Sequence, residues 1–217
     1  MRLRAGLPGA ALLVGLLVAG LLAAGPAQAL REPADYRLSL AQDAAAHAQA
    51  LSAAGSFDQA ITVAQRYLSA FGPDPAVLYE LAYAHNARGE LPAAIRAYGQ
   101  VLELNPEDAS ARYDRAELLL DQGDIDGAAA DLAVALRLRP EHWAVHYRLA
   151  EIAAHRHDAA AFENELMASL QNGLDLRSLA EDPDWVGFAK DPVVGPVLLR
   201  VVTVYGNDET LQRLQGG

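Results

Sequence analysis

The sequence predicts an all-α protein in which helical hairpins stack one on another. First, residues recur at a spacing of 34, which Gly55, Gly89 and Gly123 show most plainly. Second, alanines recur inside the segments between these glycines, and small side chains let helices pack closely. Third, Pro106 and Pro140 close two successive units, because proline cannot continue a helix. Each unit is expected to form two antiparallel helices, and several units must stack to bury a continuous core.

Residues 1–29 are expected to be a secretory signal peptide. Arg2 and Arg4 precede an apolar run from Ala10 to Ala24, and an Ala-Gln-Ala sequence at 27–29 supplies the small residues of a cleavage site. An uncleaved membrane anchor is the alternative, but the run is shorter than the roughly 20 residues that a spanning helix needs. We therefore expect cleavage after Ala29 and a mature protein that is periplasmic or secreted from a bacterium.

The charge and the residue types exclude several classes of function. The net charge is −11, with 28 acidic and 17 basic residues, so the chain repels phosphate backbones and nucleic acid is not expected as a partner. Cysteine is absent, which excludes disulfides, thiolate zinc sites and a cysteine nucleophile. The sequence also lacks a nucleophile elbow, a glycine-rich phosphate loop and a metalloprotease helix motif. We expect a protein without enzymatic activity and without a cofactor.

The second unit, residues 75–108, carries the repeat pattern most completely. Its first helix is expected to combine an aromatic residue with a small one, a glycine ends that helix, and a second small residue faces it from the partner helix. The residues concerned are Leu78, Tyr79, Leu81, Ala82, Gly89, Ala94, Tyr98 and Pro106. This pattern resembles the tetratricopeptide repeat family, and the resemblance implies a right-handed superhelical solenoid of helix pairs.

The other units resemble that family less closely. We place about four helix pairs within residues 30–174, at 41–74, 75–108, 109–142 and 143–174. In the third unit Arg115 stands where leucine is usual, so its charge must be satisfied or turned outward. In the fourth unit His157 replaces the glycine that ends the first helix.

Residues 175–217 are expected to be a C-terminal capping segment. The pairs Asp182-Pro183 and Asp191-Pro192 predict helix starts, and Trp185 lies between them in an apolar stretch. This arrangement resembles the closing segment that often ends a group of such repeats. It would cover the apolar face of the last repeat, with a final helix in the region 193–205. Residues after Gly206 are expected to fray.

The candidate binding residues lie on one face of the predicted first helices. Positions three and four apart share a face, which places Leu78, Leu81 and Ala82 on the core side and the tyrosines on another. The resemblance implies that first helices line a concave groove that holds ligands. The candidate groove residues are Tyr79, Tyr83, Asn86, Tyr113, Glu117, Tyr147 and Glu151. Tyrosine binds with little loss of rotamer freedom, and the carboxylates favour a basic peptide. The alternative for each tyrosine is packing against the next helix.

His142 and His146 are the strongest candidates for a metal site. They lie four apart at the start of a predicted helix, so both rings can face one ion, but the sequence supplies no third ligand. We therefore predict no metal site and expect an exported, non-catalytic adaptor or scaffold that binds a protein or peptide, with no membrane contact beyond the export signal. The alternatives are a metal-binding envelope protein that uses this histidine pair, and a structural repeat protein that forms homo-oligomers.

Overall fold

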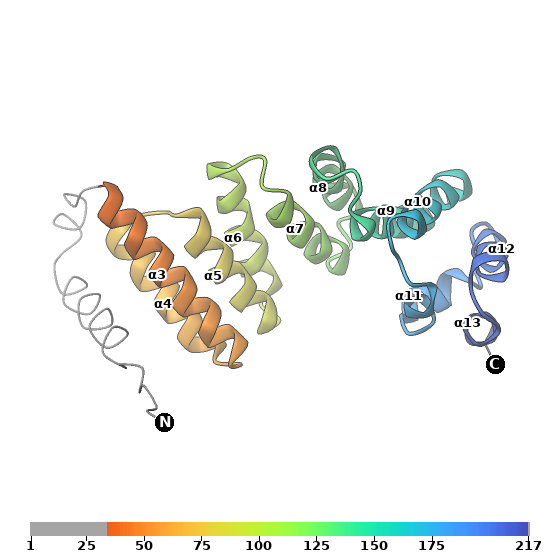
Figure 1. Ribbon diagram of the computed structural model, residues 1–217, viewed down its shortest axis with the longest axis horizontal. Helices are drawn as coiled ribbons and strands as arrows, with labels where there is room; N and C mark the ends of the chain where they lie inside the picture. Colours follow the sequence, from red (N-terminus) through yellow and green to blue (C-terminus); the bar gives the residue numbers. More distant parts are fainter. Residues whose placement is uncertain (1–33, 217) are drawn as a thin grey trace, which may run out of the picture. The chain divides into compact units, whose positions relative to one another are not determined.

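The computed structural model describes residues 34–216, which form eleven α-helices and one 3₁₀ helix, with no strand among them (Figure 1). The all-α prediction is therefore confirmed. The chain divides between Pro106 and Glu107 into two compact units, each of which is described by itself. The predicted signal peptide lies outside the described residues. Within those residues, no helix combines the length and the apolar character needed to cross a membrane.

The first unit contains two helical hairpins. They comprise α3 (Ala34–Ala53), α4 (Phe57–Phe71), α5 (Pro75–Ala87) and α6 (Leu91–Leu104), and α5 packs against both helices of the hairpin before it. Helix α3 begins at Ala34, ahead of the predicted start of the first unit at residue 41. Leu78, Leu81 and Ala82 are buried, which confirms their predicted place in the core.

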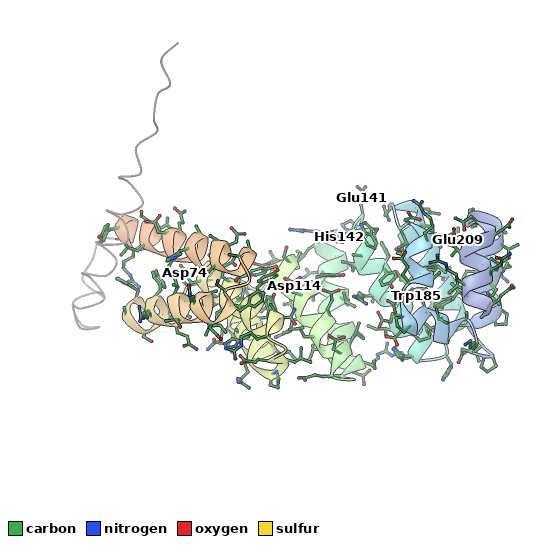
Figure 2. The ribbon with its side chains drawn as sticks, turned by 90° about the horizontal axis from the view of Figure 1, so that it is seen from below. Asp74, Asp114, Glu141, His142, Trp185 and Glu209 are labelled. Carbon is green, nitrogen blue, oxygen red and sulfur yellow. The ribbon has the colours of Figure 1, made fainter. Side chains whose placement is uncertain are left out.

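The second unit begins with two hairpins of the same kind. These comprise α7 (Ala109–Asp121), α8 (Ile125–Leu138), α9 (Trp143–His155) and α10 (Ala159–Gln171), and α9 packs against α8 and α10. Aspartates begin several helices: the Asp108 carboxylate accepts hydrogen bonds from two backbone N–H groups of α7, as Asp74 does for α5 in the first unit. At position 142, one repeat after Asp108, His142 makes no such bond; Figure 2 labels both Asp74 and His142.

The C-terminal segment follows the last helical hairpin and packs differently from it. It forms η1 (Leu176–Ala180), α11 (Pro183–Phe188), α12 (Gly195–Tyr205) and α13 (Asp208–Gln215). The segments η1 and α11 pack against α13 instead of forming a hairpin with α12. Trp185, Val197 and Leu198 lie in one buried cluster with Phe162 and Leu166 of α10. The segment thus covers apolar side chains of the last hairpin.

The prediction that residues after Gly206 fray is wrong. Asn207 accepts a hydrogen bond from the Thr210 backbone N–H and so caps α13, and Leu214 is buried in the core of the second unit. The prediction rested only on the position of this segment near the chain end. The helix cap and the buried leucine keep the segment ordered despite that position.

Arg115 is satisfied inside the second unit instead of being turned toward solvent. Its guanidinium donates to both oxygens of Asp131 on α8, at 2.6 and 2.7 Å, and Arg112 donates to the same carboxylate at 2.9 Å. Asp131 is buried. A buried carboxylate is costly unless it is paired, so the arginine at the leucine position and this aspartate depend on each other.

His157 ends α9 in the left-handed backbone conformation that glycine provides in other repeats. Its φ is +53°, compared with +74° at Gly89 and +79° at Gly123. Its Nδ1 lies 3.0 Å from Asp191 Oδ2, but the histidine is exposed and such pairs contribute little. The backbone strain is therefore the larger effect at this position.

We predict that His157→Gly stabilises the protein by about 1 kcal/mol, because the left-handed conformation costs a residue with a Cβ about that much. The melting temperature should rise by about 2–4 °C for a chain of this size. Thermal unfolding followed by circular dichroism measures the change. As the matched control, Gly123→Ala in the preceding hairpin should be destabilising. A lower melting temperature for His157→Gly would mean that the contact with Asp191 outweighs the strain.

Candidate functional site

In the first unit, the candidate groove residues differ in how far they reach solvent. Tyr79 is half-buried, and the edge of its ring meets the Tyr98 ring of α6 at 5.3 Å between centroids. Tyr83, one turn further along α5, is 48% exposed. Asn86 is exposed as well. The solvent-facing part of this row is therefore formed by Tyr83 and Asn86.

In the second unit, Tyr113 and Tyr147 use their hydroxyl groups within the protein. The Tyr113 hydroxyl donates to Glu117 at 2.9 Å, one turn along α7. The Tyr147 hydroxyl donates to Asp182 at 2.9 Å, and its ring stacks on Trp185 at 4.8 Å between centroids. Tyr147 is only 9% exposed, because these residues of the C-terminal segment cover it. Tyr147 therefore packs against the segment that follows and is not open to a partner.

Arg148 joins the candidate residues of α7 and α9 into one network. Its Nε and Nη2 donate to Glu117 at 3.1 and 2.6 Å, and its Nη1 donates to Glu151 at 2.9 Å. Its Cζ also lies 5.3 Å from the centre of the Tyr147 ring. Arg148 was not among the predicted site residues, although the sequence contains a signal for it. At the same repeat position the chain has Glu80, Asp114 and Asp182, so the charge reverses only here.

The electrostatics of this network follow from burial and pairing. Burial raises the pKa of both Tyr113 and Tyr147 far above the usual range, and the neighbouring carboxylates add to the effect, so both hydroxyls remain neutral donors. Burial alone would lower the pKa of Arg148, but its bonds to Glu151 and Glu117 outweigh that and raise it. Burial raises the pKa of Glu151 even though Arg148 favours its ionised form.

The histidine pair does not form the arrangement that the metal alternative needs. The Nδ1 of His146 lies 2.7 Å from Glu165 Oε2, and its Nε2 donates to the Pro140 carbonyl at 2.9 Å. Both ring nitrogens are therefore engaged. The ring of His142 (labelled in Figure 2) instead packs beside Tyr113 at 5.9 Å. Between residues 34 and 216, no group of three metal-binding side chains comes together.

The fold and its recurring first-helix face define a helical-hairpin repeat protein. The sequence profile of the tetratricopeptide repeat family matches residues 45–109, 87–140 and 113–175, which together span more than half of the chain. The chain therefore belongs to the tetratricopeptide repeat (TPR) family. A comparison with curated proteins found no match.

Solved structures similar to this chain are TPR proteins at low sequence identity, so they show the fold alone. MamA (residues 41 to the end) from Desulfovibrio magneticus RS-1 is 16% identical with a TM-score of 0.66, over 82% of this chain and 98% of that one. YrrB, described as a TPR protein with an unusual peptide-binding site, is 11% identical with a TM-score of 0.62, over 77% and 88%. TTC0263 from Thermus thermophilus is 18% identical with a TM-score of 0.55, over 81% and 97%.

The raised pKa of Glu151 gives a prediction about pH. A raised pKa means that the folded chain holds the proton at Glu151 more readily than the unfolded chain does, so ionised Glu151 lowers stability at neutral pH. This penalty is relieved as the pH falls through the folded pKa, and it is absent below the unfolded value near 4.3. Glu151→Gln should therefore be at least as stable as the wild type at about pH 8, and the difference should be smaller at a second, lower pH.

Urea unfolding at both pH values measures this difference. The matched control is Glu163→Gln, which removes a carboxylate from an exposed pair with Arg200 and should change stability by less than about 0.5 kcal/mol. If Glu151→Gln were clearly less stable than the wild type at the higher pH, the ion pair with Arg148 would outweigh the cost of burial.

Proposed function

We propose that the protein is an exported, non-catalytic adaptor that holds a segment of a partner protein against its first helices. The observation that carries this proposal is the tyrosine that recurs at one position of the first helices, as Tyr79, Tyr113 and Tyr147, with the exposed Tyr83 one turn further along α5. A tyrosine buries a large area on binding and keeps a polar tip for a hydrogen bond. The peptide-binding site in the description of YrrB, a protein of the same fold, adds support.

The distribution of charge favours a basic partner. Twenty of the 28 acidic residues lie at positions 107–217, together with ten of the 17 basic residues. Most arginines in this region already pair with a carboxylate of the same unit; they are Arg112, Arg115, Arg148, Arg156, Arg177, Arg200 and Arg213. The excess of carboxylates attracts a basic segment and speeds its association, an effect that salt weakens.

The test of the adaptor compares two tyrosine variants. The mature chain, residues 30–217, serves as bait for proteins of the cell envelope, and the affinity of a captured partner is then measured. Tyr83→Ala should weaken binding about tenfold or more, as loss of an aromatic anchor usually does. Tyr205→Ala is the matched control, because Tyr205 is also well exposed but lies on α12, away from the first helices.

Both variants should keep the helicity of the wild type. A partner that is lost from Tyr83→Ala and retained by Tyr205→Ala supports binding along the first helices. A partner that binds all three proteins equally, or is lost equally from both variants, contradicts it.

Export of the chain is part of the same proposal, and it rests on the charged start, the apolar run and the small residues at 27–29. We predict that the protein recovered from the periplasm or the medium of its bacterial host begins at Leu30. Amino-terminal sequencing of that protein measures the cleavage site. Recovery of the chain only with membranes, and with its first residues intact, would favour the uncleaved anchor instead.

A further inference from the structure

Arg148 occupies a place that suits the arginine of a partner. We infer that this guanidinium is an internal stand-in for a partner's arginine: it fills an acidic and aromatic pocket on the second unit, and a basic segment binds there by taking over its hydrogen bonds. This inference rests on the proposed function and deepens it. It names arginine as the partner side chain that binds, and it names the internal pairing of Arg148 as the contact that competes with it.

The surroundings of Arg148 contain the groups that bind guanidinium ions. Two carboxylates, from Glu117 on α7 and Glu151 on α9, accept its hydrogen bonds, and the face of the Tyr147 ring lies beside Cζ. Carboxylates satisfy the donors of the planar guanidinium fork, and an aromatic face attracts its charge. The pocket is thus defined by three residues on two successive first helices.

The cluster around Arg148 is partly exposed to solvent. The side chains of Arg148 and Glu117 are 25% and 34% exposed, whereas that of Glu151 is 8% exposed. All three hydrogen bonds that Glu117 accepts, from Tyr113 and twice from Arg148, end on Oε1. Among the described residues no hydrogen bond ends on the other oxygen, Oε2. An incoming guanidinium therefore meets Glu117 first, with Oε2 as its acceptor, before Arg148 has to leave.

The repeat itself does not require a cation at this place. The corresponding residues in the neighbouring repeats are Glu80, Asp114 and Asp182, so first helices pack with an acidic residue here. Arg148 is therefore better explained by the charge of the site than by the geometry of the hairpin. By neutralising Glu117 and Glu151, Arg148 weakens the attraction of the site for basic side chains in general. Only a segment that takes over its hydrogen bonds then binds.

Removal of Arg148 tests the inference. The probe is a short peptide with two arginines and blocked ends, titrated calorimetrically into the mature chain at low salt and about pH 8, where the carboxylates are ionised. Arg148→Gln should bind the probe about tenfold more tightly than the wild type, which is the scale of one well-placed charge interaction. A citrulline version of the peptide, which is uncharged, should bind neither protein.

The matched control is Arg156→Gln. It removes the same charge from the same unit, but from an exposed pair with Asp126. It should leave the affinity for the arginine peptide unchanged. An equal gain in both variants would show a general effect of net charge, and no gain in Arg148→Gln would show that Arg148 only joins α7 to α9; either result overturns the inference.

A second variant keeps the test decisive if Arg148→Gln does not fold. Arg148→Lys retains the charge, but an ammonium group cannot form the same set of planar bonds to both carboxylates. It should bind the arginine peptide more tightly than the wild type and less tightly than any folded Arg148→Gln. Affinity equal to that of the wild type overturns the inference. Failure of the proposed function is a separate result, namely partner capture that does not depend on Tyr83.

Discussion

The close approach of neighbouring helices at alanine is the constraint on which the structure depends. Ala48, Ala82, Ala116 and Ala150 recur once in each first helix, and each is fully buried. A methyl group contributes little apolar area, so these contacts stabilise by letting two backbones and their other side chains pack at native density. The constraint is on the size of the side chain at these positions, because a larger residue would push the helices apart. This requirement explains why alanine recurs at a spacing of 34 residues.

Polar contacts supply the specificity that alanine contacts lack. Arg88 pairs with Asp58 in the first unit, and Arg156 pairs with Asp126 in the second, each joining the turn of one repeat to the second helix of the repeat before it. The two pairs lie at equivalent repeat positions. Each one is exposed and weak by itself. Together with the aspartate caps, such pairs fix which hairpin follows which and at what register, where an alanine surface alone would allow slippage.

How much could be predicted from the sequence depended on whether a feature is local. The glycine turns, the buried alanines and the helix start at Asp182-Pro183 were predictable, because each requires one residue type at one backbone position. The helix start predicted at Asp191-Pro192 is wrong, since Asp191 caps a turn and α12 begins only at Gly195. The network of Arg148 was not predictable, because it joins residues 31 apart in the sequence whose meeting depends on helix rotation. The packing of Tyr147 against the C-terminal segment was among the predicted alternatives, but its hydrogen bond to Asp182 was not, because Asp182 lies 35 residues away and was interpreted only as a helix start.

Two aromatic residues close the core at the C-terminal end of the second unit. Phe162 replaces the alanine that earlier second helices carry, and Trp185 stands 34 residues after Glu151, at the position that Glu117 and Glu151 occupy before it. These two rings pack 5.7 Å apart, and Trp185 stacks on Tyr147. A fully buried ring therefore stands at the repeat position where Glu117 is partly exposed and Glu151 is paired with Arg148. Within the second unit, the surface proposed for binding is thus limited to the residues before this core, among which Tyr113 and Glu117 still reach solvent.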